Sequence, residues 1–186
     1  MENSEEIKRL TFSYTMEDLF VRRLFVASQT PAIKNQRSRS FFLYTLLFAM
    51  IIAFEYTKHY TSVPVKTLIG LFFVWLLSGN WLLKRYYKAH YRDTARNFDK
   101  NLINKVIELE ISENRVWINE NQIELTFKWE AIDRFTEINE YVFLKLKNET
   151  FIMIPKKGQD DHLPDWISAL AEKNKVMYAR NFGWKW

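Results

Sequence analysis

The chain has 186 residues, of which 48% are hydrophobic and 17% aromatic, so it is long enough to bury the core of one domain. It has no cysteine, which excludes disulfide bonds, thiolate metal sites and a cysteine nucleophile. The net charge of +5 would suit nucleic acid, but the positive excess lies beside two apolar blocks, and residues 101–186 are mildly acidic. We therefore expect no nucleic-acid partner.

The first 33 residues combine a strand pattern with a helix pattern. Leu10, Phe12 and Tyr14 alternate with polar residues, which predicts a short strand. The segment from Thr15 to Asp18 then resembles a capping box, and apolar residues recur at helical spacing until Pro31. We expect residues 1–33 to form a strand and a helix in the cytoplasm.

Two apolar blocks occupy the middle of the chain, and residues 41–54 and 67–83 carry no charge. With their flanks they reach spanning length at about 41–60 and 63–83, because a helix needs about 20 residues to cross the hydrocarbon. Both blocks are apolar on all sides, whereas the core helices of a small soluble protein would show a polar face. We therefore expect a transmembrane helical hairpin.

Positive charge on the flanks of the hairpin predicts its orientation. The loop between the blocks offers only Lys58 and Lys66, while both outer flanks are rich in cations. This bias is typical of cytoplasmic flanks, so we expect a multi-pass protein of the bacterial inner membrane with both termini in the cytoplasm. The same cations could bind anionic lipid, although fixing the topology is their simpler role. The candidate membrane-surface and lipid-binding residues are Lys34, Arg37, Arg39, Lys84, Arg85, Lys88 and Arg92.

A helical pattern continues beyond the second block. Apolar side chains recur every three to four residues from Tyr87 to Leu102. This spacing predicts a helix that leads out of the bilayer. Residues 34–105 are thus expected to form the transmembrane hairpin with a cytoplasmic helical extension.

A β-rich segment follows, in which short alternating runs are separated by polar turns, and this predicts antiparallel hairpins. Pro164 stands near the start of a final helix whose apolar stripe includes Trp166 and Leu170. The expected fold class is α+β, with a domain over residues 106–175 in which this helix covers a curved antiparallel sheet. The expected strands are 106–112, 116–119, 123–127, 131–137, 142–147 and 150–155.

The last residues, 176–186, form an aromatic and basic tail. The tail could lie against the membrane surface or against the sheet. Its residues Trp184 and Trp186 are the candidate surface for a protein partner, because most other aromatic residues of the domain, such as Trp117, Trp129 and Trp166, are needed to fill its core.

Three segments resemble a known family: Trp-Glu-Ala-Ile at 129–132, Tyr-Val-Phe-Leu at 141–144 and the strand end Phe-Ile-Met-Ile-Pro-Lys-Lys at 151–157. Together with the N-terminal strand and helix and the two apolar blocks, they are similar to the YcxB-like family of bacterial membrane proteins. The resemblance covers nearly the whole chain and implies that the C-terminal domain is an antiparallel β-barrel of the pleckstrin-homology-like kind, closed by one helix. It implies no catalytic residues.

Few side chains are candidates for chemistry. Asp160, Asp161 and His162 could supply metal ligands, but a lone trio in a loop is more often the solvated start of a helix. Carboxylates on alternating strands, such as Glu108 and Glu110, are more simply the outward face of a sheet than an acid and a base. We expect no catalytic, metal or cofactor site, and no enzyme.

Two functions remain as hypotheses. In the first, the hairpin anchors a cytoplasmic interaction module that binds a protein partner through an edge strand or an aromatic surface, as a regulatory or immunity protein would. In the second, the chain recognises anionic lipid or maintains the envelope at the inner leaflet. The bilayer is a partner in both, and the chain could oligomerise.

Overall fold

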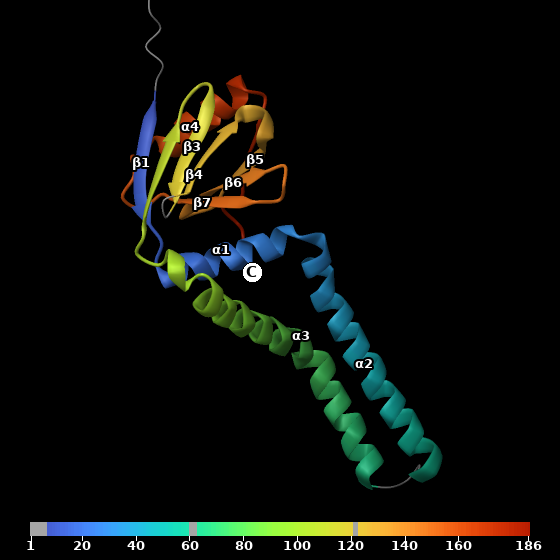
Figure 1. Cartoon of the computed structure of the whole chain (residues 1–186). Coiled ribbons are helices and arrows are strands. Elements are labelled where there is room, and N and C mark those ends of the chain that lie inside the picture. Colours follow the sequence, from blue (N-terminus) through green and yellow to red (C-terminus); the bar gives the residue numbers. More distant parts are fainter. Residues whose placement is uncertain (1–6, 60–62, 121–122) are drawn as a thin grey trace, which may run out of the picture. The chain divides into compact units, whose positions relative to one another are not determined.

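The computed structural model describes residues 7–59, 63–120 and 123–186 (Figure 1). The chain divides into two compact units, one of Met1–Arg22 with Arg96–Trp186 and one of Arg23–Ala95. The first unit contains two β-sheets, and the second consists of helices. The expected α+β fold class is therefore confirmed.

The helices are α1 (Met16–Gln29), α2 (Pro31–His59), α3 (Val63–Phe98) and α4 (Leu163–Lys173), with short 3-10 turns at Lys100–Leu102 and Trp129–Ala131. The helices α1, α3 and α4 begin close to where the sequence predicts, whereas α2 begins at Pro31, earlier than the expected start at about residue 41. The strands are β1 (Lys8–Ser13), β2 (Val106–Ile111), β3 (Arg115–Glu120), β4 (Ile123–Lys128), β5 (Ile132–Glu137), β6 (Tyr141–Leu146), β7 (Phe151–Pro155) and β8 (Met177–Arg180).

The predicted capping box at the start of α1 is confirmed. The Thr15 backbone N–H donates to Asp18 Oδ2 at 2.7 Å, and the Asp18 N–H donates back to Thr15 Oγ1 at 3.2 Å. These bonds satisfy backbone donors that the first turn of a helix leaves without partners. Asp18 also accepts a hydrogen bond from the hydroxyl of Tyr141, which ties the start of α1 to β6.

The first sheet has the strand order β1-β2-β3-β4, and its pairings are antiparallel. β1 pairs with β2, and Leu10 lies opposite Leu109 in the register. The sequence between these two strands contains α1, α2 and α3, so the helical hairpin is inserted between neighbouring strands of one sheet. β1, which lies in the expected N-terminal segment of residues 1–33, is therefore part of the same sheet as β2, β3 and β4, and residues 1–6 of that segment lie outside the described residues.

The second sheet has the order β7-β6-β5-β8. β5, β6 and β7 are antiparallel, whereas β8 pairs parallel to β5 with Phe135 opposite Tyr178. Part of the expected tail is therefore a strand of the domain. A four-residue strand with only two half-buried side chains has too little alternation to be recognised from sequence.

The core of the β unit lies on the buried faces of the two sheets and under α4. β6 and β7 are buried at nearly every position, as strands covered on both faces are, and α4 buries Leu163, Ile167 and Leu170. The described strands form two sheets and no closed barrel.

The helical unit contains two helices that could span a membrane by length and composition. The first is Pro31–Thr57, with 27 residues, and none of its most apolar stretch is buried within the protein. The second is Val65–Phe98, with 34 residues, and 11% of its most apolar stretch is buried. α3 continues without a break from its apolar half into its basic half and ends at Phe98. Exposed side chains along both helices are large and apolar, for example Phe42, Leu77 and Phe73.

Candidate functional site

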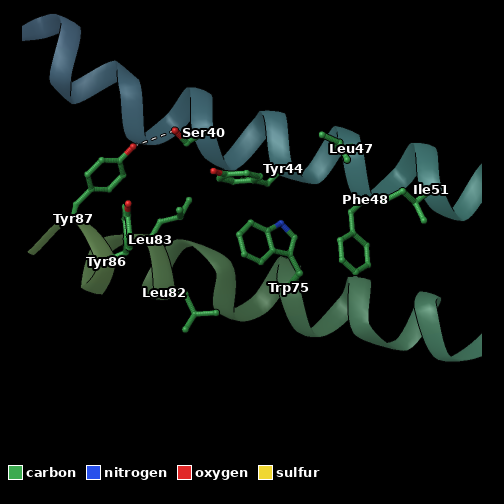
Figure 2. Close-up of a pocket in the computed structure, with 10 residues that line it drawn as sticks. All are labelled: Ser40, Tyr44, Leu47, Phe48, Ile51, Trp75, Leu82, Leu83, Tyr86 and Tyr87. Atoms are coloured by element: carbon green, nitrogen blue, oxygen red, sulfur yellow. Dashed lines mark hydrogen bonds between the residues drawn. The ribbon is translucent and has the colours of Figure 1, made fainter. Parts of the chain in front are cut away.

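An apolar groove of about 470 Å³ lies between α2 and α3 (Figure 2). Its volume is within the range of pockets that hold small molecules. Aliphatic and aromatic side chains make up most of the lining, and its polar atoms include the hydroxyls of serine and tyrosine. The lining residues are Ser40, Tyr44, Leu47, Phe48, Ile51, Trp75, Leu82, Leu83, Tyr86 and Tyr87.

Trp75 is the side chain around which this groove is built. Its ring stacks on Phe41 with a centroid distance of 5.9 Å and meets the edge of Tyr44 at 6.1 Å. Its indole N–H donates to Thr45 Oγ1 at 3.0 Å. This bond holds the ring of Trp75, a residue of α3, against α2. Gly79 makes room for the stack, because a Cβ there would lie 2.9 Å from the indole ring and 3.0 Å from Phe41.

One end of the groove is polar. The hydroxyls of Ser40 and Tyr87 are 3.1 Å apart and share a hydrogen bond between the two helices (Figure 2). Cations stand close to this pair along the chain: Arg39 precedes Ser40, and Lys88 follows Tyr87. An apolar groove with a pair of hydroxyls at one end is complementary to an amphiphile with a polar headgroup.

The second candidate surface is the outer edge of β4, the last strand of the first sheet. The large apolar residues Ile123 and Leu125 are 59% and 45% exposed, although Leu125 lies opposite the buried Ile118 and therefore on the core face of the sheet. Edge strands present unpaired backbone N–H and C=O groups, which makes them templates for another strand. β4 thus combines an available edge with an incompletely covered apolar face.

The edges of β1 and β7 are covered in a way that β4 is not. The carbonyl oxygens of Phe151 and Met153 in β7 accept hydrogen bonds from the Arg22 guanidinium and the Tyr14 hydroxyl. In β1, the Thr11 carbonyl accepts a hydrogen bond from the Gln159 side chain at 3.3 Å. Among the residues that the structure describes, no side chain bonds to β4 in this way.

A buried carboxylate forms the most polar cluster of the β unit. Glu137 is 6% exposed at its side chain and binds Lys156 Nζ at 2.9 Å and Arg180 Nε at 3.2 Å. The Tyr178 hydroxyl donates to the same carboxylate at 3.0 Å, and burial together with the negative charge of Glu137 raises the pKa of this phenol above its usual value. Both oxygens of Glu137 therefore have partners, as a buried carboxylate requires. Since the partners come from β8 and from the residue after β7, the cluster connects these two strands to β5.

The trio that could have bound a metal is used for local structure. Asp160 Oδ1 accepts the His162 backbone N–H at 2.9 Å, and Oδ2 binds Lys8 Nζ at 3.0 Å. The His162 N–H and the Lys8 ammonium hold the pKa of Asp160 below its usual value. Within residues 7–59, 63–120 and 123–186, no group of three His, Asp or Glu side chains is placed to hold a metal ion.

The structure places the predicted lipid-binding cations on two helices. Arg39 is exposed on α2, while Arg85, Lys88 and Arg92 are exposed and Lys84 is half-buried on α3. Arg85 lies over the ring of Trp81, 5.6 Å from its centroid. The side chains of two further predicted residues, Lys34 and Arg37, lie outside those that the structure describes.

The predicted partner surface of the tail is less open than expected. Trp184 and Trp186 are both half-buried, and the Trp184 N–H donates to the Asn181 carbonyl in a turn after β8. Phe182 is the exposed aromatic residue of this segment and lies under the Lys156 ammonium.

Sequence reasoning did not find the groove or single out the edge of β4. Ser40 and Tyr87 are 47 residues apart, so no local pattern connects them. The segment of β4 alternates as any half-buried strand does, and period-two patterning does not distinguish an edge strand from a central one. The exposure of Ile123 and Leu125 becomes visible only once the strand order is known.

Comparison with known proteins bears on the β unit. No curated protein and no solved structure matches the chain. Residues 111–165, which run from the end of β2 to the start of α4, match the model of the YcxB-like protein family. This segment includes the three motifs on which the resemblance was based. The resemblance to the YcxB-like family is therefore confirmed, over residues 111–165 of this chain.

Proposed function

We propose that the chain is a non-enzymatic interaction module of the bacterial inner membrane, anchored by α2 and α3 with both termini in the cytoplasm. The supporting observation is the pair of long helices whose apolar side chains face outward rather than into a core. Surface of this kind is stable against lipid and costly against water. The cations at the start of α2 and in the second half of α3 support the cytoplasmic orientation.

The β unit is, in this proposal, a pleckstrin-homology-like domain into which the membrane hairpin is inserted. The two antiparallel arrangements β1–β4 and β5–β7, followed by α4, support this finer assignment. Insertion between β1 and β2 gives the domain two covalent connections to its anchor. Two connections restrict its orientation at the membrane more than one flexible linker would.

The partner binds at the edge of β4 by adding a strand to the first sheet. Strand addition obtains affinity from main-chain hydrogen bonds and specificity from alternate side chains. β4 offers both, because its edge is available and Ile123 and Leu125 are exposed. The aromatic tail is the alternative surface, with Trp184 and Trp186 as its contact residues.

Photo-crosslinking in cells tests the interaction. A photoreactive amino acid at position 125 is expected to capture a protein in the membrane fraction, whereas one at Glu108, on the central strand β2, serves as the control. A Trp184→Ala/Trp186→Ala variant separates the two surfaces. Loss of the adducts in that variant would favour the tail, and equal capture at positions 125 and 108 would contradict strand addition at β4.

A second function, recognition of anionic lipid at the inner leaflet, is favoured by the groove between α2 and α3. An acyl chain would occupy the apolar part, and a phosphate would lie near Ser40, Tyr87 and the neighbouring cations. Native mass spectrometry of the purified chain with phosphatidylglycerol and phosphatidylcholine tests this function. The expected result is preferential retention of the anionic lipid, reduced by Leu47→Trp, which fills the groove, and unchanged by Leu77→Trp on an exposed part of α3.

A further inference from the structure

We infer that the partner of β4 is a second copy of this chain, and that the two β4 strands pair antiparallel about a twofold axis at Thr126. The inference rests on the proposed use of the β4 edge and names its occupant. In a twofold dimer the same surface of each copy contacts that of the other. The β4 strand must therefore be complementary to a second β4 strand that runs in the opposite direction. The sequence of β4, Ile-Glu-Leu-Thr-Phe-Lys, meets this condition.

Charge supplies the first argument. With Thr126 on the axis, Glu124 of each copy lies directly opposite Lys128 of the other, which gives two ion pairs. Within one chain, Lys128 lies opposite Arg115 in the β3–β4 register, an unfavourable pairing of like charges. Neither Glu124 nor Lys128 has an ion-pair partner among the described residues. A second copy therefore supplies a counter-charge to Glu124 and to Lys128.

The apolar side chains fit the same register. Leu125 of each copy lies opposite Phe127 of the other, on the face that already carries the buried residues Ile118 and Val116. Leu125 is 45% exposed in the single chain and would be covered in the pair. Aromatic and aliphatic side chains directly opposite each other stabilise antiparallel strands.

Other registers are disfavoured by the same residues. A twofold axis at Glu124 or at Lys128 would place like charges directly opposite each other. A parallel pair in register would do so at both positions. An axis at Leu125 would place Glu124 opposite Thr126 and lose both ion pairs. The charge pattern thus favours one register and one direction.

The pairing is expected to need the membrane anchor. One six-residue strand on each side makes an interface smaller than that of most stable complexes. Confining both copies to one bilayer raises their effective concentration, as a tether does. We therefore expect the pair to form in membranes and to dissociate when the chain is diluted in detergent.

Disulfide crosslinking tests the register, and the chain suits it because it has no cysteine of its own. Residues directly opposite each other in an antiparallel pair have Cα atoms about 4.5–5.5 Å apart, which is within disulfide reach. Oxidised membranes of the Thr126→Cys variant should therefore give a disulfide-linked dimer. Glu124→Cys is the matched control, because its two copies lie roughly four residues out of register, on the order of 13 Å apart.

A charge exchange tests the ion pairs. Glu124→Lys in the Thr126→Cys background should reduce the crosslinked fraction at least about fivefold. The reason is that the new lysine of each copy then lies opposite Lys128 of the other copy, so that both ion pairs become pairs of like charge. The double variant Glu124→Lys/Lys128→Glu restores opposite charges and should restore the dimer. An equal yield from Thr126→Cys and Glu124→Cys, or no dimer from Thr126→Cys, would overturn the inference.

The same membranes distinguish this inference from the proposed function. A photoreactive residue at position 125 that captures a different protein and no second copy overturns the homodimer but leaves the interaction module standing. Capture of neither overturns both. Membrane attachment is measured separately, by testing before oxidation whether the chain sediments with the membranes.

Discussion

Tyr14 and Met153 join the two sheets of the β unit: the phenol donates a hydrogen bond of 2.6 Å to the carbonyl oxygen of Met153 in β7. Tyr14 follows β1 directly and is 2% exposed, so this bond is shielded from water. Burial raises the pKa of the Tyr14 phenol well above its usual value, which keeps the hydroxyl protonated as a donor. The bond also satisfies a carbonyl on β7, which is an edge strand among the strands that the structure describes.

Tyr14→Phe is expected to destabilise the β unit. The variant retains the ring but leaves the buried Met153 carbonyl without its donor, which costs about 1–3 kcal/mol. Thermal unfolding of the full chain in detergent, followed by circular dichroism, measures the change. Tyr86→Phe, at an exposed tyrosine, is the control and should unfold like the parent. Equal unfolding of the two variants would contradict the role of the bond.

Alkaline pH is expected to destabilise the same unit. Burial is the largest cause that raises the pKa of Tyr14 and of Tyr141, so both remain protonated in the folded chain at a pH where the unfolded chain has ionised. The folded state then binds more protons, and its stability falls as pH rises above about 10. Urea unfolding at pH 8 and pH 11 should show the loss, and the loss should be smaller in Tyr14→Phe, from which one of the phenols with a raised pKa has been removed.

Gly79→Ala is expected to disrupt the contact between α2 and α3. The added Cβ would lie 2.9 Å from the Trp75 ring, so the ring must move and its stack with Phe41 is lost. Overpacking of this kind costs about 1–3 kcal/mol. Gly70→Ala is the matched control in the same helix, because nothing lies within 4 Å of its Cβ position. A lower unfolding temperature for both variants alike would argue against the packing of Trp75.

Glu137→Gln is expected to destabilise the second sheet. The variant removes the charge that pairs with Lys156 and Arg180 and weakens the bond from Tyr178. Because Glu137 is buried, the expected loss is roughly 1–3 kcal/mol. Glu149→Gln, whose carboxylate is 75% exposed and pairs with Lys145, should change the free energy of unfolding by less than about 0.5 kcal/mol. Comparable losses in the two variants would contradict a buried ionic cluster.

Local patterns in the sequence predict the individual elements well. The alternation of Leu10 and Phe12 predicts β1, the polar turns separate β2 to β7, and Thr15 and Asp18 mark the start of α1. These signals come from residues within a few positions of one another, because the periods of a strand and a helix are short.

Relationships between distant residues could not be predicted in this way. Nothing near β1 indicates that its partner is β2, on the far side of the helical hairpin. The hydrogen bond between Ser40 and Tyr87 and the edge position of β4 likewise depend on how elements pack. The candidate surfaces follow from these long-range relationships, whereas the flanking cations follow from local composition.

The most direct test of the proposed membrane anchor is labelling of single cysteines in the otherwise cysteine-free chain. A membrane-impermeant maleimide should label Thr61→Cys, between the two apolar helices, in intact cells stripped of their outer membrane. It should label the exposed Lys185→Cys only after the inner membrane is opened. Recovery of the chain in the soluble fraction as a folded monomer, or equal labelling of both positions in intact cells, would contradict the anchor and its topology.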